Sequence, residues 1–289
     1  MGSSTKSKRK NKKAPKSLKK KDRKLNAKNA DRFDLYQRSV NSPDTDVDFI
    51  TRTFEELRGR ELRHIREDFC GTANLCAEFL SRDPQNTAEG FDLDPEPMEW
   101  GKKNNFGRVS DGMERMTWHL DDVRNRSDRS PELTTAANFS YWCFKTREEL
   151  LGYFKHTLED LADDGMFVMD LYGGPEAYTE MEEIREIDGG AFEYVWDQRR
   201  WEPGTGNYEA AIHFRFRDGS ELFEAFKYDW RFWYLTELRD VLMDAGFKRV
   251  SPYFEGDDPD DEEEGDGEFR FDPIGDNCEA WIGYLVAEK

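Results

Sequence analysis

The sequence predicts an α/β fold in which a mostly parallel sheet carries helices on both faces. Between residues 61 and 174, segments with strand and helix patterns alternate, as is typical of parallel strands joined by crossover helices. After residue 174 the pattern changes to successive strands with turns at Pro203-Gly204 and Asp218-Gly219, which indicates an antiparallel insertion over about 185–233. We therefore expect a seven-stranded sheet with a β-rich lid inserted after its fifth strand.

Local signals place the elements in order. Residues 31–40 and 42–59 are expected to be helices, because apolar residues of the second segment recur at helical spacing; Asp44 or Asp46 can cap it and Gly59 can end it. Strands of the main sheet are expected at 61–69, 88–94, 116–123, 166–174, 248–256 and 279–289, and residues 135–142 are expected to form a strand and a loop. Helices are expected at 71–82, 95–105, 147–165 and 234–247, and lid strands at 192–203, 207–219 and 221–230.

Charge divides the chain into two parts. The 289 residues include 43 Lys and Arg against 62 Asp and Glu, yet residues 1–29 hold 13 of the basic residues and the single acid Asp22, which leaves about -31 on the rest. Residues 1–29 have too few apolar side chains to repay the entropy of ordering, so we expect a disordered basic tail. Residues 30–289 are expected to form the folded domain. The acidity of the folded domain disfavours the binding of nucleic acid, whereas the basic tail can attract phosphates.

The remaining composition narrows the setting. No run of 18 apolar residues and no signal peptide is apparent, so we expect neither a membrane-spanning segment nor export. The expected location is the cytoplasm. Cys70, Cys76, Cys143 and Cys278 are scattered, without the spacing of a zinc site or a disulfide scaffold. Residues 255–268 contain ten acids in fourteen positions, within an expected acidic loop over about 255–275. The ligand order of a calcium-binding loop is missing there, and no metal is expected.

Two segments carry the chemistry: EDFCGTA (67–73) and GFDLD (90–94). A strand, a sharp turn and a helix follow each other at the first segment, without the glycines or the lysine of a phosphate site. Glu67 can receive an ammonium group, and the backbone N–H groups around Gly71 can face a carboxylate. Asp92 ends the next strand 21 residues beyond Gly71, a spacing that brings its carboxylate to two ribose hydroxyls. The pair indicates a ligand with nucleoside and amino-acid parts.

The sequence resembles the class I, Rossmann-like, S-adenosylmethionine-dependent methyltransferases, in which E-x-G-C-G-T-G ends one strand and an acid ends the next. Glu67, Cys70, Gly71 and Thr72 match this pattern, whereas Phe69 and Ala73 replace two glycines. The segments LRGR, REDFCGTA, GFDLD, NFSYW, FKTR, DLYGG, DGS and YDWR are similar to a bacterial family of these enzymes whose substrate is unassigned. The resemblance extends from about Asp31 to the C-terminus.

The resemblance implies S-adenosylmethionine as cofactor and a set of site residues. Cofactor contacts are expected from Glu67, Cys70, Gly71, Ala73, Asp92, Leu93, Asp122, Val123 and Asn138, with Asp121 as a competitor of Asp122 for the adenine. NFSY (138–141) lies where nucleic-acid amino-methyltransferases have N-P-P-Y, but it lacks both prolines. If a general base is used, Tyr141 and Tyr172 are the foremost candidates, with His213 and Asp229 behind them. Tyr36, Trp142 and Arg231 are expected to meet the substrate.

These expectations lead to one principal function and two alternatives. The principal one is methylation of a small molecule beneath the aromatic lid, with the helix at 31–40 closing over the cofactor. The first alternative is an RNA base methyltransferase that uses the basic tail to attract phosphates. The second is a binding protein that keeps the fold without transferring a methyl group. The sequence does not indicate an oligomeric state.

Overall fold

The structure, a computed structural model, describes residues 22–258 and 261–289. Within these residues the main sheet has eight strands in the order β11-β10-β12-β5-β4-β1-β2-β3. The strands β1 to β5 are parallel, whereas β12 runs antiparallel to β5 and β10 is antiparallel to β11 and β12. Their bounds are β1 His64–Asp68, β2 Thr87–Asp92, β3 Met116–Leu120, β4 Leu133–Ala136, β5 Met166–Gly173, β10 Arg249–Asp258, β11 Asp261–Phe271 and β12 Trp281–Glu288.

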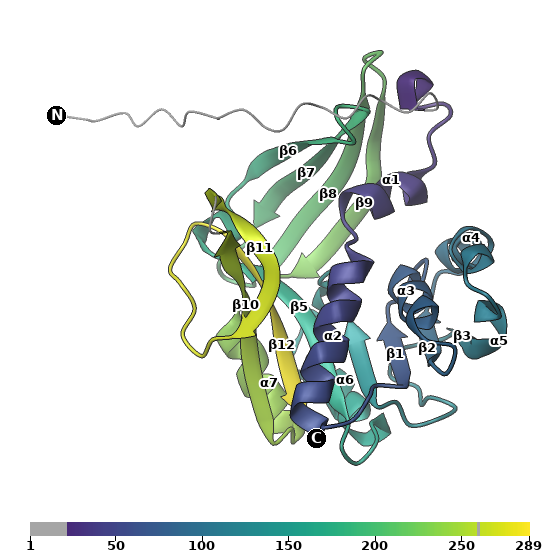
Figure 1. Cartoon of the computed structure of the whole chain (residues 1–289). Helices are drawn as coiled ribbons and strands as arrows, with labels where there is room; N and C mark the ends of the chain where they lie inside the picture. The colour runs from purple at the N-terminus through teal and green to yellow at the C-terminus, as the bar shows by residue number, and fades with distance from the viewer. Residues whose placement is uncertain (1–21, 259–260) are drawn as a thin grey trace.

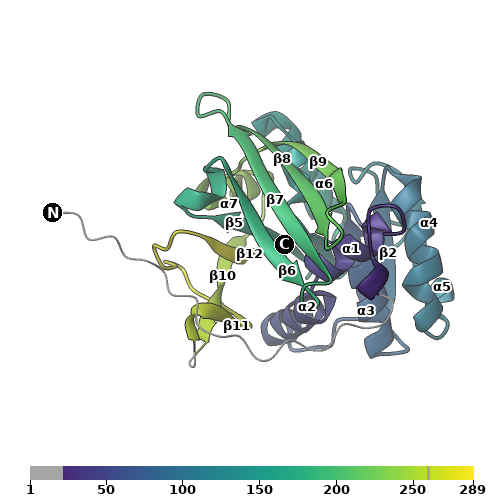
Figure 2. The same ribbon diagram turned by 90° about the horizontal axis from the view of Figure 1, so that it is seen from above.

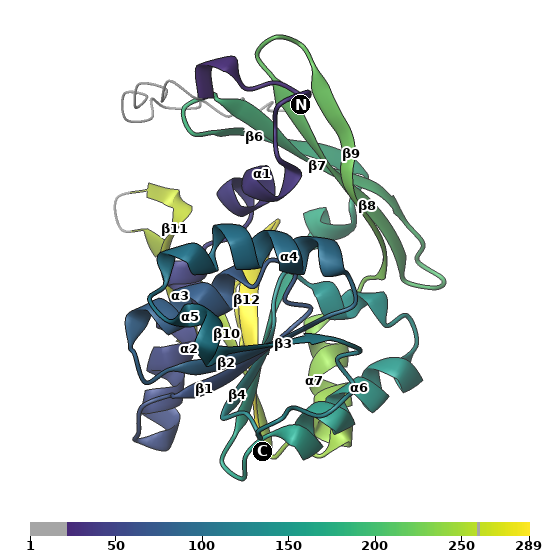
Figure 3. The same ribbon diagram turned by 90° about the vertical axis from the view of Figure 1, so that its right-hand side faces the viewer.

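Helices cover both faces of this sheet (Figure 3). Helices α2 (Pro43–Arg58) and α3 (Asn74–Arg82) pack on one face, with Phe49, Phe54 and Phe79 in its core. Helices α6 (Arg147–Asp160) and α7 (Leu235–Ala245) pack on the other. Further helical elements are α4 Pro95–Asn104, α5 Gly112–Arg115, η2 Phe106–Arg108, η3 Ser140–Cys143 and η4 Pro175–Tyr178. This layered arrangement confirms the predicted α/β class.

The ends of the helices follow local rules. Gly59 adopts φ +66° and ends α2, as predicted, because a left-handed residue allows the last carbonyls to be satisfied. Thr146 and Glu149 form a reciprocal capping box at the start of α6. Helix α2 begins at Pro43, and neither Asp44 nor Asp46 occupies its cap position, which belongs to Ser42. Asp46 is therefore free for another role.

Alternation along β1 sends neighbouring side chains to opposite faces of the sheet. The Arg66 guanidinium is buried toward α6, where it donates to Asp68 Oδ1 (2.7 Å) and Asp160 Oδ2 (2.9 Å). The Tyr153 hydroxyl donates to the other oxygen of Asp68 (2.7 Å). Glu67 points the other way, toward α3. Asp68 is therefore paired on the α6 side of the sheet, whereas Glu67 is the carboxylate of β1 that lies on the α3 side.

The insertion after β5 forms a separate antiparallel sheet in the order β6-β7-β8-β9 (Figure 1). Its strands are β6 Met181–Ile187, β7 Phe192–Trp201, β8 Asn207–Phe216 and β9 Glu221–Arg231. This is the lid expected at about 185–233. Helix α1 (Arg32–Ser39) lies between the lid and the carboxyl edge of the main sheet. In the view from above, the lid strands lie over this edge of the main sheet (Figure 2). Leu35 of α1 is buried in the lid core beside Phe192 and Phe214.

The segment before α1 is part of the folded domain. Residues 22–24 form a short helix, η1 (Asp22–Lys24), and Asp22 is buried against Arg38. Arg38 also pairs with Asp34 and, on the lid, with Asp188. The boundary expected at residue 29 was therefore wrong for residues 22–29, because buried ion pairs and the lid hold them. Residues 1–21, to which the rest of the tail prediction applies, lie outside the described residues.

Strands β10 and β11 replace the acidic loop expected at about 255–275. Residues 261–271 form β11, which adds an eighth strand to the seven that were predicted. Phe269 of β11 is buried against Phe49 of α2 and Tyr284 of β12, and this contact anchors the outer strand. No helix of the described part of the chain is long and apolar enough to cross a membrane.

Candidate functional site

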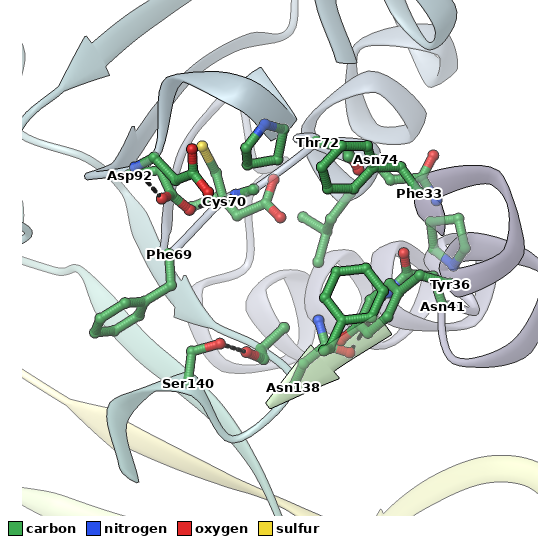
Figure 4. A pocket seen from close by; sticks show the side chains of 18 of the residues that line it. Phe33, Tyr36, Asn41, Phe69, Cys70, Thr72, Asn74, Asp92, Asn138 and Ser140 are labelled. Carbon is green, nitrogen blue, oxygen red and sulfur yellow. Dashed lines mark hydrogen bonds between the residues drawn. The ribbon is translucent and has the colours of Figure 1, made fainter. Parts of the chain in front are cut away.

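A cavity of about 310 Å³ lies at the carboxyl ends of β1, β2 and β4, close to the size range typical of small-molecule sites. Helix α1, the start of α2 and strand β9 of the lid complete its walls. Figure 4 shows Asp92, Cys70 and Thr72 on one side and Tyr36, Asn41 and Asn138 on the other. The cavity therefore lies where ligands bind in open α/β sheets.

The turn after β1 has the backbone of a glycine-rich loop without all of its glycines. Phe69, Gly71 and Ala73 adopt φ values of +55°, +50° and +48°. Phe69 and Ala73 thus keep the left-handed conformation that glycine takes most easily. The ring of Phe69 points away from the cavity and packs against Phe144 and Tyr153, so its side chain does not fill the ligand space. The replacement of both glycines leaves the loop geometry intact.

Asp92 ties the two predicted motifs together. Its Oδ2 accepts the Gly71 N–H (2.7 Å), and its Oδ1 accepts the Asp94 N–H (2.8 Å). Burial raises the pKa of the Asp92 carboxyl, although these backbone donors oppose the shift. Each oxygen keeps a second lone pair that can accept a hydrogen bond from a ligand hydroxyl.

Glu67 is a buried carboxylate that lines the cavity. One oxygen accepts the Cys76 N–H (3.1 Å) from the first turn of α3. Burial raises the pKa of Glu67 to about 7, and the nearby carboxylates of Asp46 and Asp92 add to the rise. A buried carboxylate with this environment is suited to a cationic ligand group, whose charge would offset the cost of ionisation.

The loop after β4 is held from β5. The backbone N–H groups of Asn138 and Phe139 donate to the two oxygens of Asp170 (2.7 and 3.0 Å). Both residues adopt left-handed φ values, +56° and +57°, which are costly for residues other than glycine. Burial raises the pKa of Asp170 to about 7, because desolvation outweighs the two backbone hydrogen bonds. Asp170 therefore holds the loop whose residues Asn138 and Ser140 line the cavity.

Aromatic side chains form the roof. Phe33 and Tyr36 of α1 meet Phe226 of β9 at ring distances of 6.1 and 5.0 Å, and Tyr228 of β9 also lines the cavity. Two polar contacts hold this roof to the loops below. Gln37 Nε2 donates to the Thr72 hydroxyl (2.7 Å), and Asn41 Nδ2 donates to Asn138 Oδ1 (3.4 Å).

The structure brings many of the predicted site residues together. Glu67, Cys70, Gly71, Asp92, Asn138 and Tyr36 line the cavity. Ala73 is buried within the turn, and Leu93 is exposed at the end of β2. Asp122 does not line the cavity, because it accepts hydrogen bonds from Arg124, and the neighbouring Val123 is buried in the core. The cofactor contacts expected of Leu93, Asp122 and Val123 stay predictions.

The predicted catalytic and substrate residues other than Tyr36 lie outside the cavity lining. Tyr141 is buried and its hydroxyl donates to the Asp170 carbonyl (2.8 Å), and Tyr172 donates to Tyr208 (2.8 Å). Trp142 is enclosed by aromatic rings of the lid base. Arg231 stacks on Trp233 and pairs with Glu237. These contacts give each side chain a packing role.

The two weaker base candidates are also placed away from the cavity lining. His213 is buried within the lid, where its Nδ1 accepts the Glu224 N–H (2.7 Å) and its Nε2 contacts Asp197 (3.2 Å). Asp229 forms an ion pair with Lys145. Within residues 22–258 and 261–289, no group of three or more His, Cys, Asp or Glu side chains is arranged to hold a metal ion.

Sequence reasoning missed Asp46, Asn41, Phe226 and Tyr228 as residues that line the cavity. The sequence predicts that Asp44 or Asp46 caps the helix, because an acid near a helix start is ordinarily explained in that way. The position of Asp46 depends on β12, more than 230 residues away, where Tyr284 donates a hydrogen bond to it. For Phe226 and Tyr228, the aromatic residues along 221–230 were the sequence signal that the lid contributes side chains to the cavity.

No protein-family model matches the sequence, and no curated protein is significantly similar to it. Solved structures do share its fold. An S-adenosylmethionine-dependent methyltransferase from Clostridium acetobutylicum is 16% identical with a TM-score of 0.62, over 88% of this chain and 96% of that one. The CcbJ methyltransferase from Streptomyces caelestis is 16% identical with a TM-score of 0.62, over 86% and 97%.

A third similar structure is CalS10 with S-adenosylmethionine bound, an amino pentose methyltransferase from Micromonospora echinaspora. It is 16% identical to this chain with a TM-score of 0.60, over 89% of this chain and 95% of CalS10. The chain therefore has the mixed α/β, Rossmann-like fold of S-adenosylmethionine-dependent methyltransferases, with a separate antiparallel sheet.

Proposed function

We propose that the chain is an S-adenosylmethionine-dependent methyltransferase that acts on a small-molecule acceptor beneath its lid. The observation that carries this proposal is the joint placement of Glu67, Gly71 and Asp92 around one cavity at the ends of adjacent strands. The similar structures support it through their common fold.

The donor set of the cavity fits each part of the proposed cofactor. Glu67 can hold the ammonium group. Helix α3 has no side-chain cap, so the N–H groups of its first turn, other than that of Cys76, which donates to Glu67, are available for the carboxylate of the methionine part. Asp92 has free lone pairs for the ribose hydroxyls.

Apolar surface beside Asp92 fits the adenine. Leu93 is 72% exposed at the end of β2, and Leu120 is 59% exposed at the end of the neighbouring β3. Two exposed leucines at adjacent strand ends indicate a surface that a ligand covers. When bound, S-adenosylmethionine supplies a methyl group activated by its sulfonium. The protein then has to align the acceptor with that methyl group and exclude water.

The lid supports a small acceptor. Phe33, Tyr36, Phe226 and Tyr228 cover the cavity, which leaves room for a compact ligand more readily than for a nucleotide within a polymer. CalS10, one of the structures with the same fold, acts on an amino pentose. The acidic lining of the cavity also disfavours nucleic-acid phosphates.

Calorimetric titration with S-adenosylmethionine tests the first half of the proposal. We expect saturable binding by the intact chain and weak or undetectable binding by Asp92→Ala. Absence of binding by the intact chain would overturn the proposal. Incubation with labelled cofactor and a cell extract, fractionated into metabolites, RNA and protein, tests the second half: label in the metabolites supports a small acceptor.

The same experiment separates the alternatives. Label in RNA, lost together with RNA binding when residues 1–21 are removed, supports the RNA methyltransferase. Cofactor binding without transfer to any fraction supports a non-catalytic binding protein. Removal of residues 1–21 is not expected to change cofactor affinity, because every residue that lines the cavity lies between 32 and 228.

A further inference from the structure

Asp46 occupies a distinct position in the cavity. It belongs to the first turn of α2 and receives a hydrogen bond from the hydroxyl of Tyr284, on β12. Its carboxylate interacts electrostatically with Glu67 of β1 and Asp170 of β5. Tyr284 is paired with Asp170 of β5, which holds the loop that carries Asn138, so Asp46 lies on the Asn138 side of the cavity.

This position separates Asp46 from the part of the cavity assigned to the nucleoside. Asp92 is on β2, on the far side of β1 from β4. In the function proposed above, Glu67 holds the ammonium group and Asp92 the ribose of the cofactor, which leaves the Asn138 side of the cavity for the acceptor. Asp46 is therefore placed toward the acceptor rather than toward the ribose.

The charge of the lining points to a cationic acceptor. Asp46, Glu67, Asp92 and Asp94 line the cavity, and the basic side chain that lines it, Arg32, is paired with Glu96. Glu67 and Asp92 have partners in the proposed cofactor, and Asp94 caps α4 by accepting the Glu96 N–H. Asp46 is left with a neutral partner, the Tyr284 hydroxyl.

The roof adds an independent feature that suits a cation. Phe33, Tyr36, Phe226 and Tyr228 surround the cavity, and aromatic rings attract ammonium groups through the negative charge of their faces. A carboxylate together with several rings is the combination by which proteins commonly recognise amines. An alcohol acceptor could donate a hydrogen bond to the carboxylate, but it carries no positive charge for the rings to attract.

We propose, on the basis of the proposed methyltransferase function, that the acceptor is an amine and that Asp46 binds its ammonium form and takes its proton. The N–H bond breaks and the proton moves to the Asp46 carboxylate. The nitrogen lone pair then forms a bond to the methyl carbon, while the carbon–sulfur bond breaks and its electron pair stays on sulfur. The products are a methylated ammonium, a thioether and a protonated carboxyl that returns its proton to water.

The surroundings of Asp46 support a role in proton transfer. Burial raises the pKa of Asp46 to about 6, the Tyr284 hydrogen bond opposes the rise, and Asp44 adds to it. Glu67 and Asp170 face it from β1 and β5. A carboxylate with a raised pKa accepts a proton more readily than an ordinary one. Methylation should accordingly decline on the acid side of pH 6.

A pair of cofactor analogues tests the position of Asp46. Sinefungin carries an amine where the cofactor carries its transferable methyl group, whereas S-adenosylhomocysteine carries nothing there. We expect Asp46→Asn to weaken sinefungin about tenfold or more and to leave S-adenosylhomocysteine affinity almost unchanged, because only sinefungin presents a cation to the carboxylate. The amide can still accept the Tyr284 hydrogen bond, so the variant should fold.

Asp44→Asn is the matched control, because Asp44 is an exposed acid in the same helical turn. It should leave the ratio of the two affinities unchanged. An equal loss of both analogues in Asp46→Asn would place Asp46 at the methionine end of the cofactor and overturn the proposal. Failure of both analogues to bind the unmodified chain would instead overturn the proposed function itself.

Transfer of an isotope-labelled methyl group to a metabolite extract tests the acceptor class. The carbon chemical shift of the transferred methyl distinguishes attachment to nitrogen, oxygen or sulfur. Label on nitrogen, reduced in Asp46→Asn and retained in Asp44→Asn, supports the proposal. Label on oxygen, sulfur or carbon overturns it.

Discussion

Glu67→Gln should make the ligand-free protein more stable at pH 8 and leave it nearly unchanged at pH 4.5. The unfolded chain ionises Glu67 near its ordinary pKa of 4.5, whereas burial raises the folded pKa to about 7. Between these values the folded state holds a proton that the unfolded state has released. The free energy of unfolding therefore falls as pH rises from about 4.5 to about 7 and then stays level.

The size of the effect follows from that difference in pKa. A tenfold change in proton affinity corresponds to about 1.4 kcal/mol, so the rise in the Glu67 pKa corresponds to about 3 kcal/mol. Glutamine cannot ionise, and its carbonyl oxygen can still accept the Cys76 N–H. Because the buried amide has a desolvation cost of its own, we expect a gain of about 1 to 3 kcal/mol at pH 8.

Urea unfolding followed by tryptophan fluorescence at both pH values measures this difference. The control is Glu114→Gln, an exposed acid that does not line the cavity and should change little at either pH. An equal stability difference at pH 4.5 and pH 8, or a loss of stability at pH 8, would refute the reasoning. The gain should be accompanied by weaker binding of S-adenosylmethionine, because the variant no longer carries the charge that receives the ammonium group.

Three further variants test the loops and the roof. Asp92→Asn should weaken S-adenosylmethionine about tenfold or more by calorimetry, while the exposed control Asp128→Asn should not; equal affinities would remove Asp92 from the site. Gly101→Ala should cost about 1 to 3 kcal/mol and lower cofactor affinity, because a Cβ there would lie 2.1 Å from the Thr72 carbonyl oxygen. Gly107→Ala, whose Cβ would have no neighbour within 4 Å, should be neutral in both measurements, and matching losses would contradict the packing explanation. Arg38→Ala should destabilise the protein by about 2 to 3 kcal/mol in thermal or urea unfolding, because it leaves the buried Asp22 unpaired. The exposed Arg126→Ala should cost less than about 0.5 kcal/mol, and a similar loss in both variants would argue against a special role for the Arg38 network.

The parallel part of the fold was predictable because its signals are local. Strands β1 and β2 are each followed by a turn and a helix within a few residues, and the acids at their ends stand in the same short segments. Glu67, Gly71 and Asp92 were therefore recognised together, and the structure places them around one cavity.

The missed features depend on contacts between distant parts of the chain. Asp46 is placed by Tyr284, and Asp170 acts on a loop some 30 residues before it. Strand β11 was hidden because its acidic composition is typical of a loop and its partner strand supplies the ordering. Residues 22–29 looked like the rest of a basic tail, although the lid provides a surface for them.

Phe69 and Ala73 also bear on how relatives of this chain can be found. Both residues adopt the left-handed backbone that glycine takes most easily, although neither is one of the glycines by which such loops are usually detected. The feature shared with a glycine-rich loop is thus a conformation, and more than one residue type can supply it. A search for relatives built on glycine spacing would pass over this branch, whereas one built on the sequence of backbone conformations from Phe69 to Ala73 would retain it.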